Sequence, residues 1–282
     1  RNLGIPEGIK ELTSTFDYNN IESVIESIDS DTACVILEPF VFEAPKDNFL
    51  QKLQQVCKGN GTLLIFDEMW SGFRIALGGA QEYFGITPDL AVYSKAFANG
   101  MPISLLTGRK DVMQLFEKDV FFFTTFGGEA LSMAAAIATI SEMRDKNVQK
   151  ELDRKGQLLK DGYNKIAEEL GISNYTKCSG YNCRTIITFD SSAGDPLILK
   201  SYVQQEMIKR GILWGGFHNM CFTHTEKDIE HTLKAYKEVL GLLKVAVAEN
   251  KVAAMLKGEP VEAVFGKVSG FNMKPKQVLT KN

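Results

Sequence analysis

The sequence predicts an α/β protein with a parallel sheet, followed by a smaller α+β domain. Short apolar runs without polar alternation recur in the first half of the 282-residue chain. Such runs are typical of parallel strands that are covered on both faces. Three successive runs end in charged residues, and helical patterns dominate from Glu129 onward. Together these observations favour a sheet whose strand ends carry polar side chains.

Four apolar runs are the predicted strands of this sheet. They span residues 31–37, 62–66, 90–93 and 103–107. Between the first two runs, apolar residues recur at helical spacing from Phe49 to Cys57, and Gly59 or Gly61 provides a stop. The first two strands and this helix therefore form a strand–helix–strand unit.

The second half is predicted to be mainly helical. A helix that begins at Glu129 presents one broad apolar face made of Leu131, Ala134, Ala135, Ile137 and Ile140. A second helix, over about residues 148–170, ends at Gly171 and buries Leu152, Leu158, Leu159, Tyr163 and Ile166. Residues 184–189 are a predicted strand, residues 196–210 a helix, and residues 225–228 resemble a capping box. We expect a large domain over residues 1–145, a small domain over 146–243 and a tail over 244–282.

Composition excludes several classes of protein. The chain has 32 Lys and Arg against 35 Asp and Glu, so no strong field favours nucleic acid or an anionic membrane. Its apolar runs are too short to span a bilayer, and its first residues do not resemble a signal peptide. Five scattered cysteines predict free thiols in a reducing, cytoplasmic compartment. The cysteines and the three histidines lack the spacing of a metal site, so we expect no metal and structural histidines.

Polar residues at the ends of the predicted strands are the main clue to function. Glu38 follows the first strand, Asp67 and Glu68 the second, and Lys95 the third. In open α/β sheets, ligands bind at the carboxyl edge of the strands. Bringing carboxylates and an amine together there is costly unless they pair or hold a ligand. Either an ion pair at the sheet edge or a ligand site explains this pattern.

Local sequences favour a ligand site. Residues 64–74, LIFDEMWSGFR, resemble the Asp-Glu signature of class III aminotransferases, and residues 90–102, LAVYSKAFANGMP, resemble their Schiff-base lysine segment. The interval of 95 − 67 = 28 residues also matches that family. Residues 124–129 and 223–229 resemble two later motifs, while residues 78–81 and 84–90 are similar to the glutamate-1-semialdehyde aminomutase-like branch. The resemblance covers about residues 1–240.

The resemblance implies fold type I of the pyridoxal-phosphate (PLP) enzymes and a role for each matching residue. Lys95 forms the Schiff base and then moves a proton, and we expect it to be buried because desolvation lowers the pKa of an amine. Asp67 keeps the pyridine nitrogen of the cofactor protonated. Met69 packs on the cofactor ring. Thr125 of one subunit of a homodimer binds the cofactor phosphate in the neighbouring subunit. Thr125 also fits a helix N-cap, which is the alternative interpretation. Glu38 lies on the substrate side or is a structural acid.

The implied reaction is PLP-dependent transamination between an amino donor and a carbonyl acceptor. Residues 40–45, Trp70-Ser71 and Glu129-Ala130 depart from the true aminomutases near the expected pocket. These departures favour an aminotransferase, with glutamate-1-semialdehyde 2,1-aminomutase as the alternative. The absence of a G-x-G-x-x-G motif after the first strand argues against dinucleotide binding.

One part of the family pattern is not recognisable. Class III aminotransferases carry a phosphate loop, a ring that stacks on the cofactor and a substrate-carboxylate group ahead of the segment that resembles this chain, and none is recognisable before Thr32. We therefore expect a fragment or an incompletely represented protein that binds PLP weakly or not at all by itself. A cofactor-free module for dimerisation or binding is the non-enzyme alternative.

Overall fold

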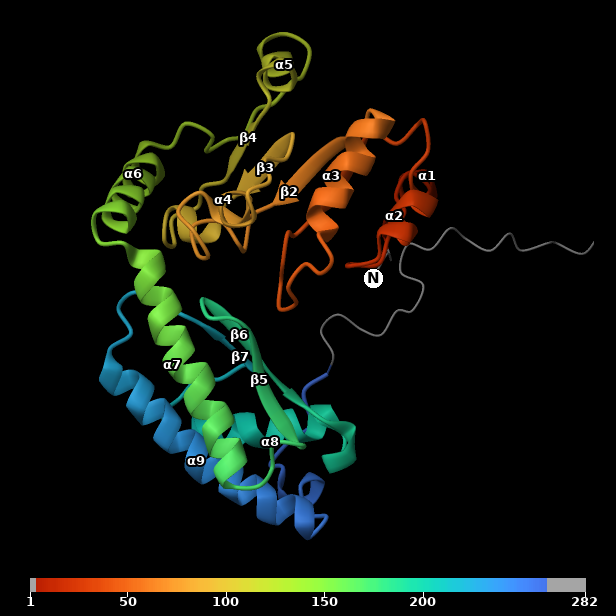
Figure 1. Cartoon of the computed structure of the whole chain (residues 1–282). Helices are drawn as coiled ribbons and strands as arrows, with labels where there is room; N and C mark the ends of the chain where they lie inside the picture. Colours follow the sequence, from red (N-terminus) through yellow and green to blue (C-terminus); the bar gives the residue numbers. More distant parts are fainter. Residues whose placement is uncertain (1–3, 263–282) are drawn as a thin grey trace, which may run out of the picture.

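The computed structural model describes residues 4–262, which form two sheets with their own helices. Figure 1 shows the first sheet with α2 and α3 in the upper part and the second sheet with α7, α8 and α9 in the lower part. The first sheet has the order β1-β2-β3-β4, with β1 (Cys34–Leu37), β2 (Leu63–Asp67), β3 (Leu90–Tyr93) and β4 (Leu105–Gly108). The four apolar runs are thus confirmed as strands.

The direction of β4 differs from the parallel sheet that we expected. β1, β2 and β3 are parallel, whereas β4 is antiparallel to β3. The link from β3 to β4 contains a short 3₁₀ helix, η1 (Lys95–Phe97), and no crossover helix. A parallel return requires a crossover of about a dozen residues or more, so this link brings the chain back in the opposite direction.

One face of the first sheet carries the buried core. This core includes Phe66, Ala91 and Tyr93 of the strands and residues of α2 (Ile21–Ser27) and α3 (Phe49–Asn60). On the opposite face, Ile36 of β1 is 55% exposed, and the side chains of β2 and β3 are half-buried. The expectation that both faces are covered is therefore wrong for β1. Side chains of adjacent residues in a strand face opposite ways, so a continuous apolar run does not show what covers each face.

Helix α6 (Ala130–Asp145) forms where we expected it, but with a different face inward. Leu131 is 65% exposed and Ile137 is 68% exposed, whereas Ser132 and Ala136 are buried. Ala136 packs with the cluster around Phe97. Because small and apolar residues surround this helix, their spacing does not select one face.

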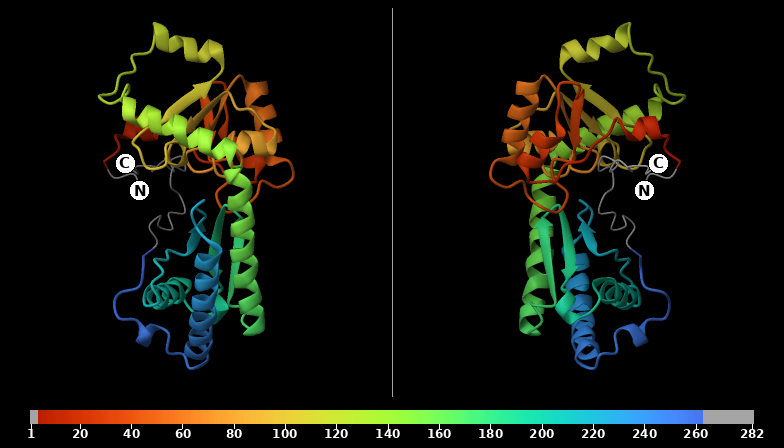
Figure 2. Two further views of the ribbon diagram at one scale, coloured as in Figure 1. Left: turned by 90° about the vertical axis from the view of Figure 1, so that its left-hand side faces the viewer. Right: turned by 90° about the vertical axis from the view of Figure 1, so that its right-hand side faces the viewer.

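The second sheet is antiparallel and has the order β5-β6-β7, with β5 (Thr176–Tyr181), β6 (Arg184–Phe189) and β7 (Phe217–Asn219). Three helices pack with it: α7 (Val148–Glu169), α8 (Pro196–Ile208) and α9 (Glu226–Ala248) (Figure 2). The predicted capping box is confirmed, since the Thr225 side chain accepts from the Asp228 backbone N–H and Asp228 accepts from that of Thr225. Four of the five predicted inward residues of α7 are buried, the exception being Leu158.

The shorter elements connect these layers. They are α1 (Glu7–Lys10), α4 (Gly79–Phe84), α5 (Lys110–Met113), η2 (Gln114–Glu117), η3 (Ser191–Ala193) and η4 (Ala253–Met255). Within residues 4–262, no helix combines the length and the apolarity that crossing a bilayer requires. The predicted tail lies partly outside the described residues.

The two parts touch through aromatic side chains. The ring centroids of Phe40, after β1, and Tyr181, in β5, are 4.4 Å apart. Gln149 Nε2, at the start of α7, donates to the Phe73 carbonyl oxygen at 2.9 Å. A single core of the second part extends from Val148 to Val252. The division into domains at residues 145 and 243 stays a prediction.

Two helical glycines allow a matched test of this packing. A Cβ on Gly156 of α7 would lie 1.8 Å from the Asn182 carbonyl oxygen, whereas a Cβ on Gly241 of α9 would meet nothing within 4 Å. We predict that Gly156→Ala lowers the free energy of unfolding by about 2 kcal/mol, because the hairpin must move. Gly241→Ala should raise it by roughly 0.5–1 kcal/mol, since alanine favours the helix. Urea unfolding measures both changes, and a stable Gly156→Ala protein would contradict the close approach.

Candidate active site

Three charged side chains meet at the carboxyl edge of the first sheet. Glu38 directly follows β1, Asp67 is the last residue of β2, and Lys95 comes two residues after β3. Asp67 is in register with Val92, so β2 and β3 end at the same edge. Burial raises the pKa of the Glu38 carboxyl, and the charges of Arg184, Asp67 and Lys95 also act on it. The charges of Asp67 and Lys95 therefore act on Glu38 across this edge, and the roles of the three residues stay a prediction.

The neighbouring carboxylates Asp67 and Glu68 have different environments. Glu68 is 0% exposed and accepts hydrogen bonds from the Ser71 hydroxyl and from the backbone N–H groups of Ala80 and Gln81, at 2.8 and 2.9 Å for the latter two. Burial raises the pKa of the Glu68 carboxyl despite these hydrogen bonds. Glu68 thus joins the turn after β2 to the start of α4. Asp67 is left half-buried at the sheet edge, where its Oδ1 accepts from the Met69 N–H at 2.9 Å.

Lys95 has an unusual backbone conformation. Its φ of 48° lies in the left-handed region, which costs a non-glycine residue about 1–2 kcal/mol. The preceding residue helps to define this turn, because the Ser94 hydroxyl donates to the Ile103 carbonyl oxygen at 2.7 Å. The Lys95 side chain is exposed, so the expectation of a buried lysine is wrong for the described residues. Strained backbone held by its surroundings is often found at functional positions.

Met69 and Thr125 are less closely tied to this edge. Met69 is half-buried in the turn after Asp67, whereas Thr125 is exposed in the turn that precedes α6. The N-cap of α6 is Glu129, whose carboxylate accepts from the backbone N–H groups of Leu131 and Ser132, both at 2.7 Å. The alternative that Thr125 is the N-cap is therefore wrong. Within residues 4–262, no hydrogen bond or ion pair links Thr125 to Asp67 or Lys95.

Arg184 lies beside Glu38, a neighbour that the sequence did not reveal. We expected only the start of a strand there, yet the guanidinium carbon lies 3.1 Å from the ring centroid of Trp70 and 4.5 Å from that of Phe42. Its NH1 group is 4.0 Å from Glu38 Oε2. Burial lowers the pKa of Arg184 to about 10. The one sequence signal for this arginine was a charged residue at the start of an apolar strand. The sequence could not show which side chains Arg184 contacts, because Glu38, Phe42 and Trp70 are distant from it along the chain.

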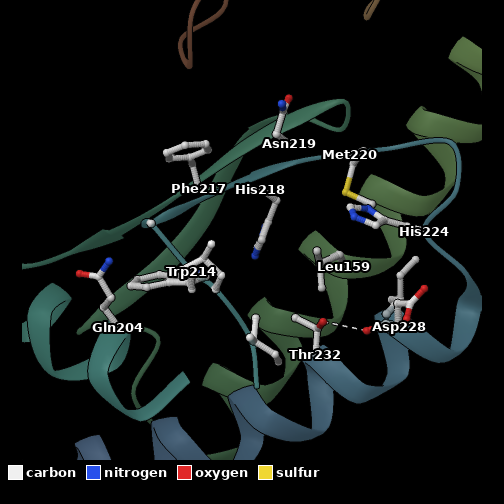
Figure 3. A pocket seen from close by; sticks show the side chains of 14 residues that line it. Leu159, Gln204, Trp214, Phe217, His218, Asn219, Met220, His224, Asp228 and Thr232 are labelled. Carbon is white, nitrogen blue, oxygen red and sulfur yellow. Dashed lines mark hydrogen bonds between the residues drawn. The ribbon is translucent and has the colours of Figure 1, made fainter. Parts of the chain in front are cut away.

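A cavity of about 520 Å³ lies elsewhere, within the second part (Figure 3). It is lined by residues of the second part such as Trp214, His218 and Thr232, and by none of the strand-end residues. The His218 side chain points into it, with hydrogen bonds from its ring to Thr185 Oγ1 and to the Tyr236 hydroxyl, both 2.7 Å. Burial lowers the pKa of His218 to about 4, so the imidazole is neutral at pH 7. These contacts fit the structural role that we expected.

Comparison with known proteins identifies the family. The family model of class-III aminotransferases matches residues 6–219. The chain belongs to the class III aminotransferases. This family consists of PLP-dependent enzymes, and its fold is fold type I. The resemblance that the motifs predicted is thereby confirmed.

Relatives of this class III chain include aminomutases. The chain is 32% identical over 260 residues to the glutamate-1-semialdehyde 2,1-aminomutase of Sulfurihydrogenibium azorense, covering 85% of this chain and 61% of the relative. It is 35% identical over 256 residues to the enzyme of that name from Alkaliphilus oremlandii, covering 86% and 60%. The chain thus spans about three fifths of the length of these curated relatives.

Solved structures support the same fold. The FumI protein of Sphingopyxis sp. MTA144, determined in its PLP internal aldimine form, superimposes with a TM-score of 0.76 at 28% identity, over 83% of this chain and 58% of that protein. An omega-transaminase from Sphaerobacter thermophilus gives a TM-score of 0.78 at 21% identity, over 86% and 60%. The second likeness shows the fold alone.

The buried Glu68 carboxyl predicts a pH dependence. Because its pKa in the folded chain is raised above the ordinary 4.5, the stability from protonated Glu68 is fully present below pH 4.5 and is lost as the pH rises through the raised value. The wild type should therefore lose unfolding free energy relative to Glu68→Gln as the pH rises from 4 to 7. Urea unfolding at several pH values measures this shift. Glu22→Gln, on an exposed position of α2, controls for the loss of one carboxylate, and parallel curves for the wild type and Glu68→Gln would contradict the prediction.

Proposed function

We propose that this class III aminotransferase binds PLP at Lys95 and Asp67 and transfers an amino group from an amino donor to a carbonyl acceptor. The observation that carries the proposal is the convergence of an amine and a carboxylate at one sheet edge, where the Glu38 carboxyl responds to both charges. A ligand in contact with both groups must lie against the ends of β2 and β3. The Asp67 and Lys95 assignments rest on this placement together with the family motifs.

The free atoms of these two residues fit the cofactor. Asp67 Oδ1 is occupied by the Met69 N–H, and Oδ2 makes no hydrogen bond within the described residues. That oxygen is available for a protonated ring nitrogen. Lys95 Nζ makes no hydrogen bond or ion pair among residues 4–262, so its amine is available to react with an aldehyde. When bound, PLP supplies an electron sink for a carbanion at the substrate carbon.

Each side chain then has a defined task. Asp67 would hold the ring nitrogen of the bound cofactor, and its carboxylate would favour the protonated form of that nitrogen. The Lys95 amine would act as the general base that takes the proton from the substrate carbon. Lys95 begins the short 3₁₀ helix η1 and has a left-handed φ. This backbone conformation sets the direction in which the Lys95 side chain leaves the end of β3. We further propose that Met69 packs on the ring and that Glu38 lies on the substrate side.

We propose a homodimer in which Thr125 of one subunit binds the cofactor phosphate of the other. The exposed Thr125 turn lies in a segment of exposed apolar residues, which supports a covered surface. These residues are Phe121, Phe122, Phe123, Phe126, Leu131, Met133 and Ile137. A contiguous apolar surface of this kind marks an interface in most proteins.

The curated relatives favour glutamate-1-semialdehyde 2,1-aminomutase as a second candidate function. Two of the departures from that branch, Trp70 and Phe42, contact the guanidinium group of Arg184, whereas Glu129 caps α6. The Glu129 departure therefore has a structural explanation. Incubation with glutamate-1-semialdehyde alone separates the functions, because the mutase rearranges it without a second substrate.

We also propose a reducing, cytoplasmic location. All five cysteines are free, and Cys34 and Cys221 are exposed. Exposed thiols persist in reducing compartments.

The assignment of Lys95 predicts a single site of covalent attachment. After incubation with PLP and reduction with borohydride, peptide mapping by mass spectrometry should find the pyridoxyl group on Lys95. Lys95→Ala should lose this adduct almost completely, and Asp67→Asn should reduce its yield because the ring nitrogen loses its ionic partner. The exposed lysine variant Lys118→Ala should keep the yield of the wild type. A label spread over many exposed lysines, or none on Lys95, would favour the cofactor-free module.

The homodimer predicts a sensitive apolar position on α6. Ile137→Glu should shift the chain toward the monomer in analytical ultracentrifugation, because burying the new carboxylate in an interface is costly. Leu213→Glu, at a residue that is 93% exposed in the second part, is the matched control and should leave the mass distribution unchanged. A monomeric wild type, or equal behaviour of both variants, would reject this interface.

A further inference from the structure

The cavity of the second part is large enough for a small molecule. Its volume is about 520 Å³. Side chains of β7, of the segment that precedes β7 and of α7, α8 and α9 line it (Figure 3). An apolar cavity of about 150 Å³ holds benzene, so the volume here accommodates a molecule of two fused rings with a substituent. The volume also lies within the usual range of ligand sites in proteins.

The floor of the cavity, formed by Leu159, Trp214, Met220 and Ile229, is apolar and buried. Each of these side chains is at most 6% exposed. The rim is open to solvent, since Leu213 in the same lining is 93% exposed. A small molecule can therefore enter from solvent, and an apolar body is stabilised there because it leaves water.

One polar atom of this apolar floor lacks a partner. Trp214 is 3% exposed, and its Nε1 is buried and makes no hydrogen bond within residues 4–262. Burial raises the pKa of the Tyr236 hydroxyl and the Trp214 side chain opposes that rise, yet no hydrogen bond joins the two groups. An indole N–H is a donor only, so an acceptor such as a carbonyl oxygen would satisfy it.

His218 points into the cavity, but its hydrogen-bonding groups are already used. Its ring nitrogens bond to Thr185 Oγ1 and to the Tyr236 hydroxyl, both at 2.7 Å. Because burial lowers its pKa to about 4, the imidazole is neutral at pH 7. His218 is therefore a neutral part of the wall, and the Trp214 N–H is left as a donor for a ligand.

The charge of the lining favours a neutral ligand. Asp228 and His224 lie at the exposed rim. Asp228 Oδ2 accepts from the N–H and from the hydroxyl of Thr225, both at 2.7 Å, within the cap of α9. His224 Nδ1 accepts from the Cys221 N–H at 3.2 Å. Neither side chain provides a countercharge at the floor, so a charged ligand would lose its hydration without compensation.

We propose that this cavity is a binding site for a neutral, mainly apolar carbonyl compound of about two fused rings, and that the Trp214 N–H donates to its carbonyl oxygen. This site goes beyond the proposed transfer of an amino group. Its binding requires neither Lys95 nor PLP, because none of the strand-end residues lines the cavity.

Prodan, a neutral naphthyl ketone whose emission rises in apolar surroundings, is the probe for this site. Its emission should rise saturably with the full 282-residue chain. Thr232→Phe places a phenyl ring in the lining and should weaken Prodan binding by about tenfold or more. Lys234→Phe, at an exposed position of the same helix, is the matched control and should change the affinity less than about twofold.

Competition between matched naphthalenes tests the hydrogen bond. Acetylnaphthalene carries a carbonyl group and naphthalene does not, and both affinities are measured by displacement of Prodan. Trp214→Phe keeps an apolar ring but loses the N–H, so the ratio of the two affinities should fall roughly three- to tenfold, as expected for one hydrogen bond. The ratio cancels the effect of the smaller ring. Naphthoate, an anion of similar size, should displace Prodan more weakly than acetylnaphthalene.

Exposed apolar residues elsewhere also attract an apolar probe, so a second control is needed. Phe122 is 72% exposed, and Phe122→Ser should keep the Prodan affinity of the wild type. Lack of saturable binding, loss of binding in Phe122→Ser, or equal binding by the wild type and Thr232→Phe would overturn the site. An unchanged ratio in Trp214→Phe would overturn the hydrogen bond, and tighter binding of naphthoate than of acetylnaphthalene would overturn the neutral ligand class. If Trp214→Phe fails to fold, the comparison of Thr232→Phe with Lys234→Phe still decides whether the cavity is occupied.

Discussion

The parallel pairing of β1, β2 and β3 is the constraint on which the site depends. Parallel strands end at a common edge, so Glu38, Asp67 and Lys95 meet there although they are far apart in the sequence. The buried Glu68 stabilises the same arrangement from the other side of the strand, because its carboxylate binds the backbone at the start of α4. The turn after β2 is thus held in place by Glu68, and Asp67 is the half-buried carboxylate at the sheet edge.

The second sheet contributes to this edge through the hairpin of β5 and β6. Tyr181 packs on Phe40, and the Arg184 guanidinium contacts the rings of Trp70 and Phe42, so the second part touches the segments that follow β1 and β2. The strand ends of the first sheet supply the amine and the carboxylate, and the hairpin of the second part supplies a guanidinium group.

Much of the fold follows from local pattern. The strands β1 to β3, the helix α3, the helix α7 and the capping box of α9 are all where the spacing of apolar and capping residues predicts them. Predictions that required knowledge of neighbours were less successful. The direction of β4, the inward face of α6, the exposed Ile36 of β1 and the exposure of Lys95 all differ from expectation. The short link after β3 sets the direction of β4, whereas the inward face of α6 is selected by packing against the cluster around Phe97, which is distant in the sequence.

The sequence by itself determined the family, because the motifs around Asp67 and Lys95 and their spacing are local and specific. It also predicted that the strand ends carry the chemistry, since strand period and charge are visible along the chain. Only the tertiary structure showed that Glu68 is buried against the start of α4, and that Arg184 lies against Trp70. The physical reason is that the direction of a side chain alternates along a strand, and packing between distant segments selects which side is buried.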